Sequence, residues 1–145
     1  DGVNFKVYNY NSEDENSLSH NRITEITLDN QGRIWVGTMK GLNLYNRKED
    51  NFIRIKKYSN TLEYYTNTIK DIAPIDSTFM WVATDVGVDK LNTKTLETLS
   101  ITSNNVLSIV DDKESALWIC TEKNIEVYNY KLKHLNIQKT VRLMQ

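Results

Sequence analysis

The strongest constraint on this 145-residue chain is a block of 24 residues that occurs three times. The blocks align without a gap over 23–46, 69–92 and 106–129, and each contains one of the three tryptophans, Trp35, Trp81 and Trp118. Fixed offsets from the tryptophan carry one residue type in all three blocks: a β-branched aliphatic residue twelve positions before it, isoleucine nine before, threonine three after and asparagine eleven after. The tryptophans are 46 and 37 residues apart, which is near the period of several repeat architectures.

Each block divides into three short segments of strand pattern, and a fourth alternating segment follows it. Turn residues that accept left-handed backbone separate the segments, as Asn30-Gln31-Gly32 and Met39-Lys40-Gly41 do in the first unit. The predicted strands are 23–29, 33–38, 42–48 and 52–58 in the first unit, 68–75, 79–84, 88–94 and 96–102 in the second, and 106–111, 117–121, 125–131 and 134–138 in the third. The composition, with one proline and many aromatic residues, also favours an all-β fold.

Four strands in a unit of this length, with a tryptophan in the second strand, are typical of a blade of a β-propeller. We expect three four-stranded antiparallel blades, at 23–58, 68–102 and 106–138. Residues 1–22 are expected to supply the last strand of a preceding blade, over 4–10, and a polar interblade loop, and 139–145 are a candidate for the start of another blade. Pro74 falls in the innermost strand of its blade, where a free edge tolerates a residue without an N–H donor.

Propeller blades pack face to face, so we expect the three tryptophans to lie between blades and not to stack on sugar rings. Cys120 takes the position that Gly37 and Ala83 hold in the other units, which predicts a small buried residue and not a reactive thiol. Closed propellers need roughly four to eight blades, so three blades form an incomplete propeller fragment. Its open faces predict neighbouring blades of the parent chain as partners, or self-association of the fragment.

Several function classes are disfavoured by the composition and motifs. A net charge of −1 gives no electrostatic reason to expect nucleic-acid binding, and no stretch approaches the ~20 apolar residues that cross a bilayer. His20 and His134 lack a partner at metal-ligand spacing, and no cofactor motif is present, so we predict no metal and no cofactor. Asp29, Asp76, Asp111 and Asp112 precede the first turn of each unit, where turn chemistry explains them better than acid–base catalysis. We therefore assign no catalytic residues.

The first unit resembles the two-component regulator propeller repeat, through the runs 29–38 (DNQGRIWVGT) and 41–46 (GLNLYN) and the junctions 5–8 (FKVY), 16–19 (NSLS) and 21–23 (NRI). The second and third units depart from the pattern, with Ala83, Cys120 and Asn124 at positions where the first unit has glycine. The resemblance implies the periplasmic sensor region of a hybrid two-component histidine kinase, attached to the inner membrane through other parts of the parent chain. It also implies oligosaccharides as the usual ligands.

Specificity in repeat scaffolds lies in loops that break the repeat. The connection 47–68 is nine residues longer than 93–105, and its excess contains Tyr64 and Tyr65 beside small polar residues, a combination suited to sugars. By propeller geometry this loop shares an end of the fold with the turns after the second strands. The candidate ligand residues are therefore Tyr64, Tyr65, Lys40, Asp85 and Arg22.

Two other functions stay open at this point. A glycan-active propeller enzyme, a lyase or a hydrolase, would need clustered acids or histidines on the innermost strands, which offer only Thr24, Glu25, Lys70, Asp71 and Ser108. A purely structural protein-interaction propeller is also compatible with the sequence, because resemblance supports fold better than ligand.

Overall fold

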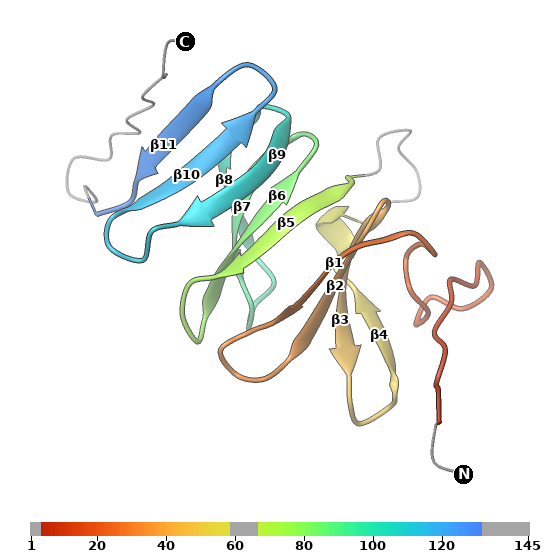
Figure 1. Ribbon diagram of the computed structural model, residues 1–145. Coiled ribbons are helices and arrows are strands. Elements are labelled where there is room, and N and C mark those ends of the chain that lie inside the picture. The colour runs from red at the N-terminus through yellow and green to blue at the C-terminus, as the bar shows by residue number, and fades with distance from the viewer. Residues whose placement is uncertain (1–3, 59–66, 132–145) are drawn as a thin grey trace.

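The computed structural model describes residues 4–58 and 67–131, which form three antiparallel sheets (Figure 1). The first sheet contains β1 (Ile23–Leu28), β2 (Ile34–Thr38), β3 (Gly41–Asn46) and β4 (Asn51–Arg54), followed by a 3-10 turn, η1 (Lys56–Tyr58). The second contains β5 (Ile69–Pro74), β6 (Phe79–Thr84), β7 (Gly87–Asn92) and β8 (Thr98–Thr102). The third contains β9 (Val106–Asp111), β10 (Ala116–Thr121) and β11 (Ile125–Asn129). This confirms the all-β class and the blade-like units; the predicted strand 134–138 and the segment 139–145 lie outside the described residues.

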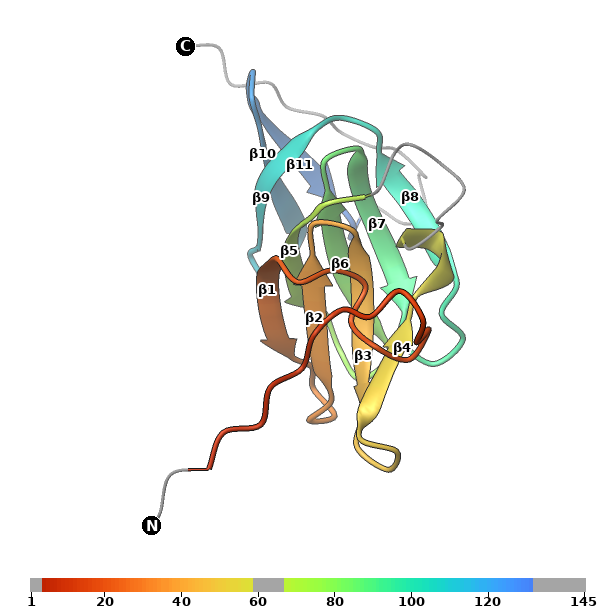
Figure 2. The same cartoon turned by 90° about the vertical axis from the view of Figure 1, so that its right-hand side faces the viewer.

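Each sheet is a simple meander whose strands pair in chain order. The first strands of the three sheets, β1, β5 and β9, contact one another in series, β1 against β5 and β5 against β9. The sheets therefore stand side by side around their first strands, as blades stand around a propeller axis (Figures 1 and 2). Pro74 ends β5, which is an edge strand of its sheet, so its missing N–H costs no ladder bond on the free side. Within the described residues, no helix is long and apolar enough to cross a bilayer.

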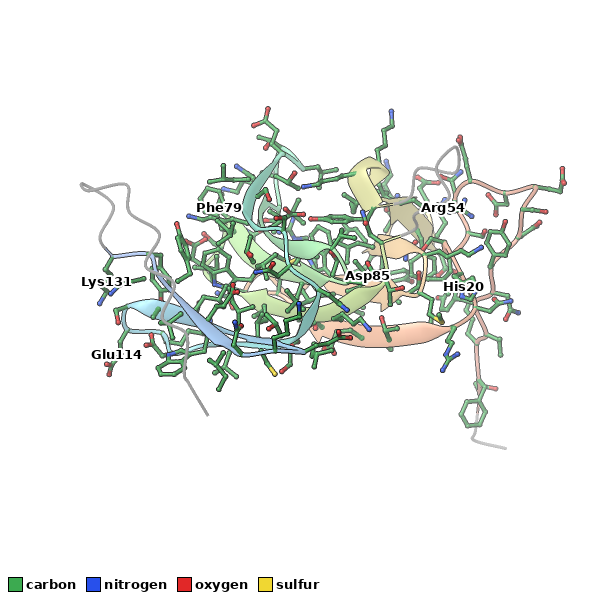
Figure 3. All side chains as sticks on the ribbon, turned by 90° about the horizontal axis from the view of Figure 1, so that it is seen from above. His20, Arg54, Phe79, Asp85, Glu114 and Lys131 are labelled. Atoms are coloured by element: carbon green, nitrogen blue, oxygen red, sulfur yellow. The ribbon has the colours of Figure 1, made fainter. Side chains whose placement is uncertain are left out.

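The space between the first and second sheets is filled by one buried apolar cluster. Trp35 contributes from β2, and Ile69 and Ile72 contribute from β5 of the next sheet. A second cluster between the second and third sheets repeats the arrangement, with Trp81 on one side and Val106 and Ile109 on the other. Side chains fill both spaces in the view from above (Figure 3). For Trp35 and Trp81 the predicted packing between blades is confirmed.

Close approach explains why the residue two positions after the tryptophan is small. A Cβ added to Gly37 would lie 2.6 Å from Cγ2 and 2.8 Å from Cβ of Ile69, on the neighbouring sheet. At the second interface the corresponding residues, Ala83 and Val106, share the same buried cluster. The first interface thus combines glycine with isoleucine and the second combines alanine with valine, so the total side-chain volume is similar at the two interfaces.

The outer face of the third sheet departs from the prediction. Trp118 is 43% exposed although its two counterparts are buried, and Cys120, two residues further along β10, is only half-buried. Both side chains lie on the face that would meet a following sheet, and the described residues place no sheet there. The expectations of a tryptophan between blades and of a buried cysteine are therefore wrong for this unit.

Residues 4–10, predicted as a strand, are extended but pair with no strand. The described residues place no sheet beside them that could complete a ladder. The segment instead lies against the first sheet, where Tyr8 packs edge-on against Phe52 with ring centroids 5.2 Å apart. Arg54 holds the following polar loop by donating to backbone carbonyls of Asp14 and Ser17 at 3.0 and 2.9 Å. The N-terminal segment thus partly covers the face of the first sheet that is turned away from the second.

Candidate functional site

The connections that lead into β1 and β5 lie at the same end of the sheets as the β2–β3 and β6–β7 turns. The backbone N–H of Met39 donates to the carbonyl of Arg22 at 3.1 Å, and that of Asp85 donates to the carbonyl of Thr68 at 3.2 Å. These turns and the β10–β11 turn form the upper end in Figure 1. We call this end the turn end of the fold.

The turns at this end have one local cause, the threonine that closes each second strand. Lys40 N–H donates to Thr38 Oγ1 at 3.0 Å, and Val86 N–H donates to Thr84 Oγ1 at 3.1 Å. Thr121 Oγ1 accepts in the same way from Lys123 N–H at 3.2 Å. Each hydroxyl replaces a backbone partner in a tight turn, which explains why threonine recurs three residues after the tryptophan.

Three of the five predicted ligand residues lie at the turn end. Arg22 and Lys40 are exposed. The hydrogen bond from the N–H of Met39, the residue before Lys40, to the carbonyl of Arg22 holds the two backbone segments together. Asp85 lies on the next turn, where its Oδ1 accepts from Thr68 N–H at 3.2 Å. Thr68 Oγ1 also donates to the carbonyl of Met39 at 3.0 Å, so this threonine joins the turns of the first and second sheets. Tyr64 and Tyr65 lie outside the described residues.

The turn end therefore presents two cationic side chains on the first sheet and a carboxylate on the second, held on hydrogen-bonded turns. Such an arrangement can donate to and accept from a polyhydroxylated ligand. Within the described residues, no group of three or more His, Cys, Asp and Glu side chains could hold a metal ion. The Nδ1 of His20 accepts from Arg22 N–H at 2.9 Å, which is a local loop contact; His134 lies outside the described residues.

A set of buried polar residues in the third strands was missed from the sequence. They lie eight residues after each tryptophan and are Asn43, Asp89 and Glu126. Each binds the connection that precedes its own sheet: Asn43 Oδ1 accepts from Ser19 N–H at 3.0 Å, and Glu126 Oε1 accepts from Asn104 Nδ2 at 2.7 Å. The signal was a polar residue eight positions after the tryptophan in all three units.

The corresponding contact in the second unit is charged. Tyr58 Oη donates to Asp89 Oδ2 at 2.6 Å, and Lys57 Nζ lies 2.8 Å from the same oxygen. Burial raises the pKa of Tyr58, and the neighbouring carboxylate raises it further. The phenol thus stays protonated and donates to a paired carboxylate, which fixes the start of the connection 56–68 rather than providing a nucleophile.

The carboxylates at the opposite end serve turns, as the sequence predicts. Asp76 Oδ1 accepts from the N–H groups of Thr78 and Phe79 at 2.7 and 2.8 Å. Asp112 Oδ1 accepts from three successive backbone N–H groups, of residues 114, 115 and 116, and these bonds lower its pKa to about 2. An acid held ionised in this way is a poor proton donor near neutral pH.

Two further carboxylates, Asp29 and Asp111, accept from the buried indoles. Trp35 Nε1 donates to Asp29 Oδ2 at 2.9 Å within one sheet. The second unit has Ile75 at the position of Asp29, and Trp81 Nε1 instead donates to Asp111 Oδ2 of the next sheet at 2.9 Å. Burial raises the pKa of Asp29, but hydrogen bonds from Trp35, Arg33 and Gln31 outweigh it and hold the pKa below its ordinary value.

Comparison with known proteins supports the repeat and the fold. Residues 17–40 match the family model of the two component regulator propeller, a segment that includes the first turn of the turn end. A comparison with curated proteins gives no match.

Solved structures share the fold over nearly the whole chain. The extracellular domain of BT3049 from B. thetaiotaomicron, described as a hybrid two component system, matches with a TM-score of 0.69 and 20% identity over 97% of this chain. The extracellular domain of BT4673 from the same organism, described in the same way, matches with a TM-score of 0.69 and 22% identity over 95% of this chain. This chain spans 20% of either structure. PorZ, a bacterial surface component of the type-IX secretion system of Porphyromonas gingivalis, matches with a TM-score of 0.58 and 22% identity over 81% of this chain and 18% of PorZ. At these identities the likeness establishes the fold.

Proposed function

We propose that this chain is part of the extracytoplasmic propeller of a hybrid two-component sensor histidine kinase, and that the propeller senses oligosaccharides. The match of residues 17–40 to the two component regulator propeller carries the proposal. The fold shared with the extracellular domains of BT3049 and BT4673 supports it. In this proposal the domain lies in the periplasm, binds ligand and passes the bound state across the membrane through other parts of the parent chain, which also hold the kinase activity.

The turn end is the proposed ligand-contacting region. Arg22 and Lys40 provide exposed donors and Asp85 provides an acceptor, on turns that Thr68 holds together. Tyr64 and Tyr65 precede Thr68 closely in the chain and supply aromatic faces of the kind that stack on sugar rings. Hydrogen bonds fix the β2–β3 and β6–β7 turns, so ligand binding would require little ordering of these two turns.

The test is a calorimetric titration of the chain with short oligosaccharides, one series of neutral sugars and one of uronic acids. We expect at least one series to bind, and we expect Lys40→Ala and Arg22→Ala each to weaken that binding by about tenfold, the loss of one charged hydrogen bond. Lys48→Ala is the matched control, because Lys48 is exposed in the β3–β4 turn at the opposite end.

The control should bind like the unaltered chain. Absence of binding in both series, or equal weakening by Lys48→Ala, would count against the turn end as an oligosaccharide site. Unfolding curves of the variants should coincide with that of the unaltered chain, which shows that any lost affinity is local.

A further inference from the structure

A buried hydrogen-bond network lies at the turn end of the first sheet. Its three members are Ser19, Thr38 and Asn43, of which Ser19 is 8% exposed and the other two are fully buried. Ser19 belongs to the connection that leads into β1, Thr38 ends β2, and Asn43 lies in β3. The network therefore joins the connection to two strands of the sheet that it enters.

The side-chain polar groups of the network all have partners. Asn43 Oδ1 accepts from Ser19 N–H at 3.0 Å, and Asn43 Nδ2 donates to Ser19 Oγ at 2.9 Å and to the carbonyl of Val36 at 3.1 Å. Ser19 Oγ lies 2.8 Å from Thr38 Oγ1. Because Thr38 Oγ1 donates its own hydrogen to the Gly41 carbonyl at 3.1 Å, the Ser19 hydroxyl is the donor of this pair. A fully satisfied buried network is rigid, since any broken bond leaves an unpaired polar group.

The network reaches the backbone segments of both exposed cations of the turn end. Thr38 Oγ1 accepts from Lys40 N–H at 3.0 Å. Three residues after Ser19, the carbonyl of Arg22 accepts from Met39 N–H at 3.1 Å. The turn that carries Lys40 is therefore tied to the connection at two points. One is the hydroxyl pair of Ser19 and Thr38, and the other is the backbone bond to Arg22.

The second and third units form the same turn without this tie. Within the described residues, Thr84 Oγ1 bonds only to groups of its own turn, the N–H of Val86 and the carbonyl of Gly87. Thr121 Oγ1 likewise bonds only within the turn that follows it. Closure of the turn thus does not require a partner such as Ser19. The tie instead belongs to the unit that carries both cations of the candidate site.

We propose that Ser19 is a positioning residue of the turn end, which fixes the backbone of Arg22 relative to that of Lys40. A ligand that contacts both side chains would then not have to order the two backbone segments, and this lowers the entropic cost of binding. The proposal rests on the proposed function for the binding of ligand. The relative fixing of the two segments can be measured without any ligand.

The first test is amide hydrogen exchange, measured residue by residue on the ligand-free chain. In Ser19→Ala we expect Met39 N–H, which bonds to the Arg22 carbonyl, to exchange about tenfold faster than in the unaltered chain, as the loss of a buried hydrogen bond predicts. The internal reference is Asp85 N–H, which makes the equivalent bond to the Thr68 carbonyl in the second sheet. Its exchange should not change, whereas a loss of overall stability would accelerate both amides.

Substitutions of Thr38 repeat the test from the other side of the hydroxyl pair and keep it decisive where Ser19→Ala fails to fold. Thr38→Val removes the hydroxyl with little change of shape and should accelerate Met39, whereas Thr38→Ser keeps the hydroxyl and should not. The matched control is Thr84→Val, which removes the counterpart hydroxyl in the second unit and should leave Met39 unchanged. Unchanged exchange at Met39 in both Ser19→Ala and Thr38→Val, or equal acceleration at Met39 and Asp85, would overturn the proposal.

The second test is a binding cycle with the neutral and uronic acid oligosaccharides as probes. Ser19→Ala should weaken binding by about three- to tenfold in the unaltered chain, and by less than about twofold in Arg22→Ala, where one of the two positioned side chains is gone. Equal weakening in the two backgrounds would overturn the positioning role. Absence of binding to the unaltered chain would refute the proposed function, and the exchange rates would then decide by themselves whether Ser19 fixes the two segments.

Discussion

The contact between Gly37 and Ile69 gives the sharpest test of how closely the first two sheets approach. In Gly37→Ala the new Cβ would lie 2.6 Å from Ile69 Cγ2, about 1 Å inside ordinary van der Waals contact, and 2.8 Å from Ile69 Cβ. Ile69 is buried and its Cβ cannot swing away, so the sheets or the side chain must shift. Overpacking of this size costs about 1–3 kcal/mol of unfolding free energy.

Removal of the atom that the new Cβ approaches most closely should relieve part of this cost. Ile69→Ala removes Cγ2, whereas Ile69→Val would keep both Cγ2 and Cβ. Ile69→Ala alone should cost roughly 2–5 kcal/mol through lost burial and the cavity that it leaves. The double variant should be more stable than the sum of the two single changes predicts, by about 0.5–3 kcal/mol, as expected for residues in contact.

Urea unfolding followed by both tryptophan fluorescence and circular dichroism measures these free energies, provided that the two transitions coincide. Gly32→Ala is the matched control, because Gly32 has a φ of 74° and nothing within 4 Å of an added Cβ. It should lose about 1–2 kcal/mol from backbone strain alone and add independently to Ile69→Ala. A neutral Gly37→Ala, or strict additivity of Gly37→Ala with Ile69→Ala, would refute the close approach of the sheets.

Two further predictions concern ionisable groups. Tyr58→Phe removes the hydroxyl that donates to buried Asp89 and should cost about 1–3 kcal/mol in urea unfolding at pH 7. Because the pKa of Tyr58 is raised in the fold, its contribution is present below its ordinary pKa of 10.0 and is lost as the pH rises beyond that value; the variant should therefore lose less stability than the unaltered chain between pH 9 and pH 11. The pKa of Asp112 is lowered to about 2 from 3.8, so its contribution is present above about pH 4 and is lost as the pH falls towards 2. Asp112→Asn should accordingly flatten the acid limb of a stability–pH profile, and a profile that keeps its slope would contradict the three backbone hydrogen bonds as the cause.

The sheets could be predicted from the sequence because the repeat imposes the same physical requirements three times. Threonine three residues after the tryptophan caps a turn in every unit. The nearly continuous apolar runs of β2 and β6 follow from burial of both sheet faces. One block alone would have been ambiguous. Three aligned blocks separate the positions that the fold needs from those that vary.

Contacts between units were harder to predict, because alignment shows which residues are equivalent but not what each one touches. The exposure of Trp118 follows from the absence of a neighbouring sheet among the described residues, and no property of the third unit alone reveals it. The switch of Trp81 to Asp111 depends on Ile75 and on the distance between two sheets. The buried polar residues of the third strands were visible as a pattern, but their partners lie in connections with no common sequence.

The sequence correctly predicted that Arg22, Lys40 and Asp85 lie at one end of the fold. In a meander, the connection into the first strand and the turn after the second strand must lie at the same end of the sheet. The role of Thr68 as the link between two turns was not foreseen. This link depends on the side-chain rotamer of Thr68 and on the carbonyl of Met39, 29 residues earlier in the chain, and no spacing rule specifies such a contact. The ligand contacts of Tyr64 and Tyr65 stay predictions.

The central claim is that each sheet packs its tryptophan against the first strand of the next. A methyl–aromatic nuclear Overhauser spectrum of the chain tests it most directly. The account predicts cross-peaks from the Trp35 indole to the methyl groups of Ile69 and Ile72, and from the Trp81 indole to those of Val106 and Ile109. Cross-peaks from either indole to methyl groups of its own sheet alone would contradict the stacked-blade arrangement.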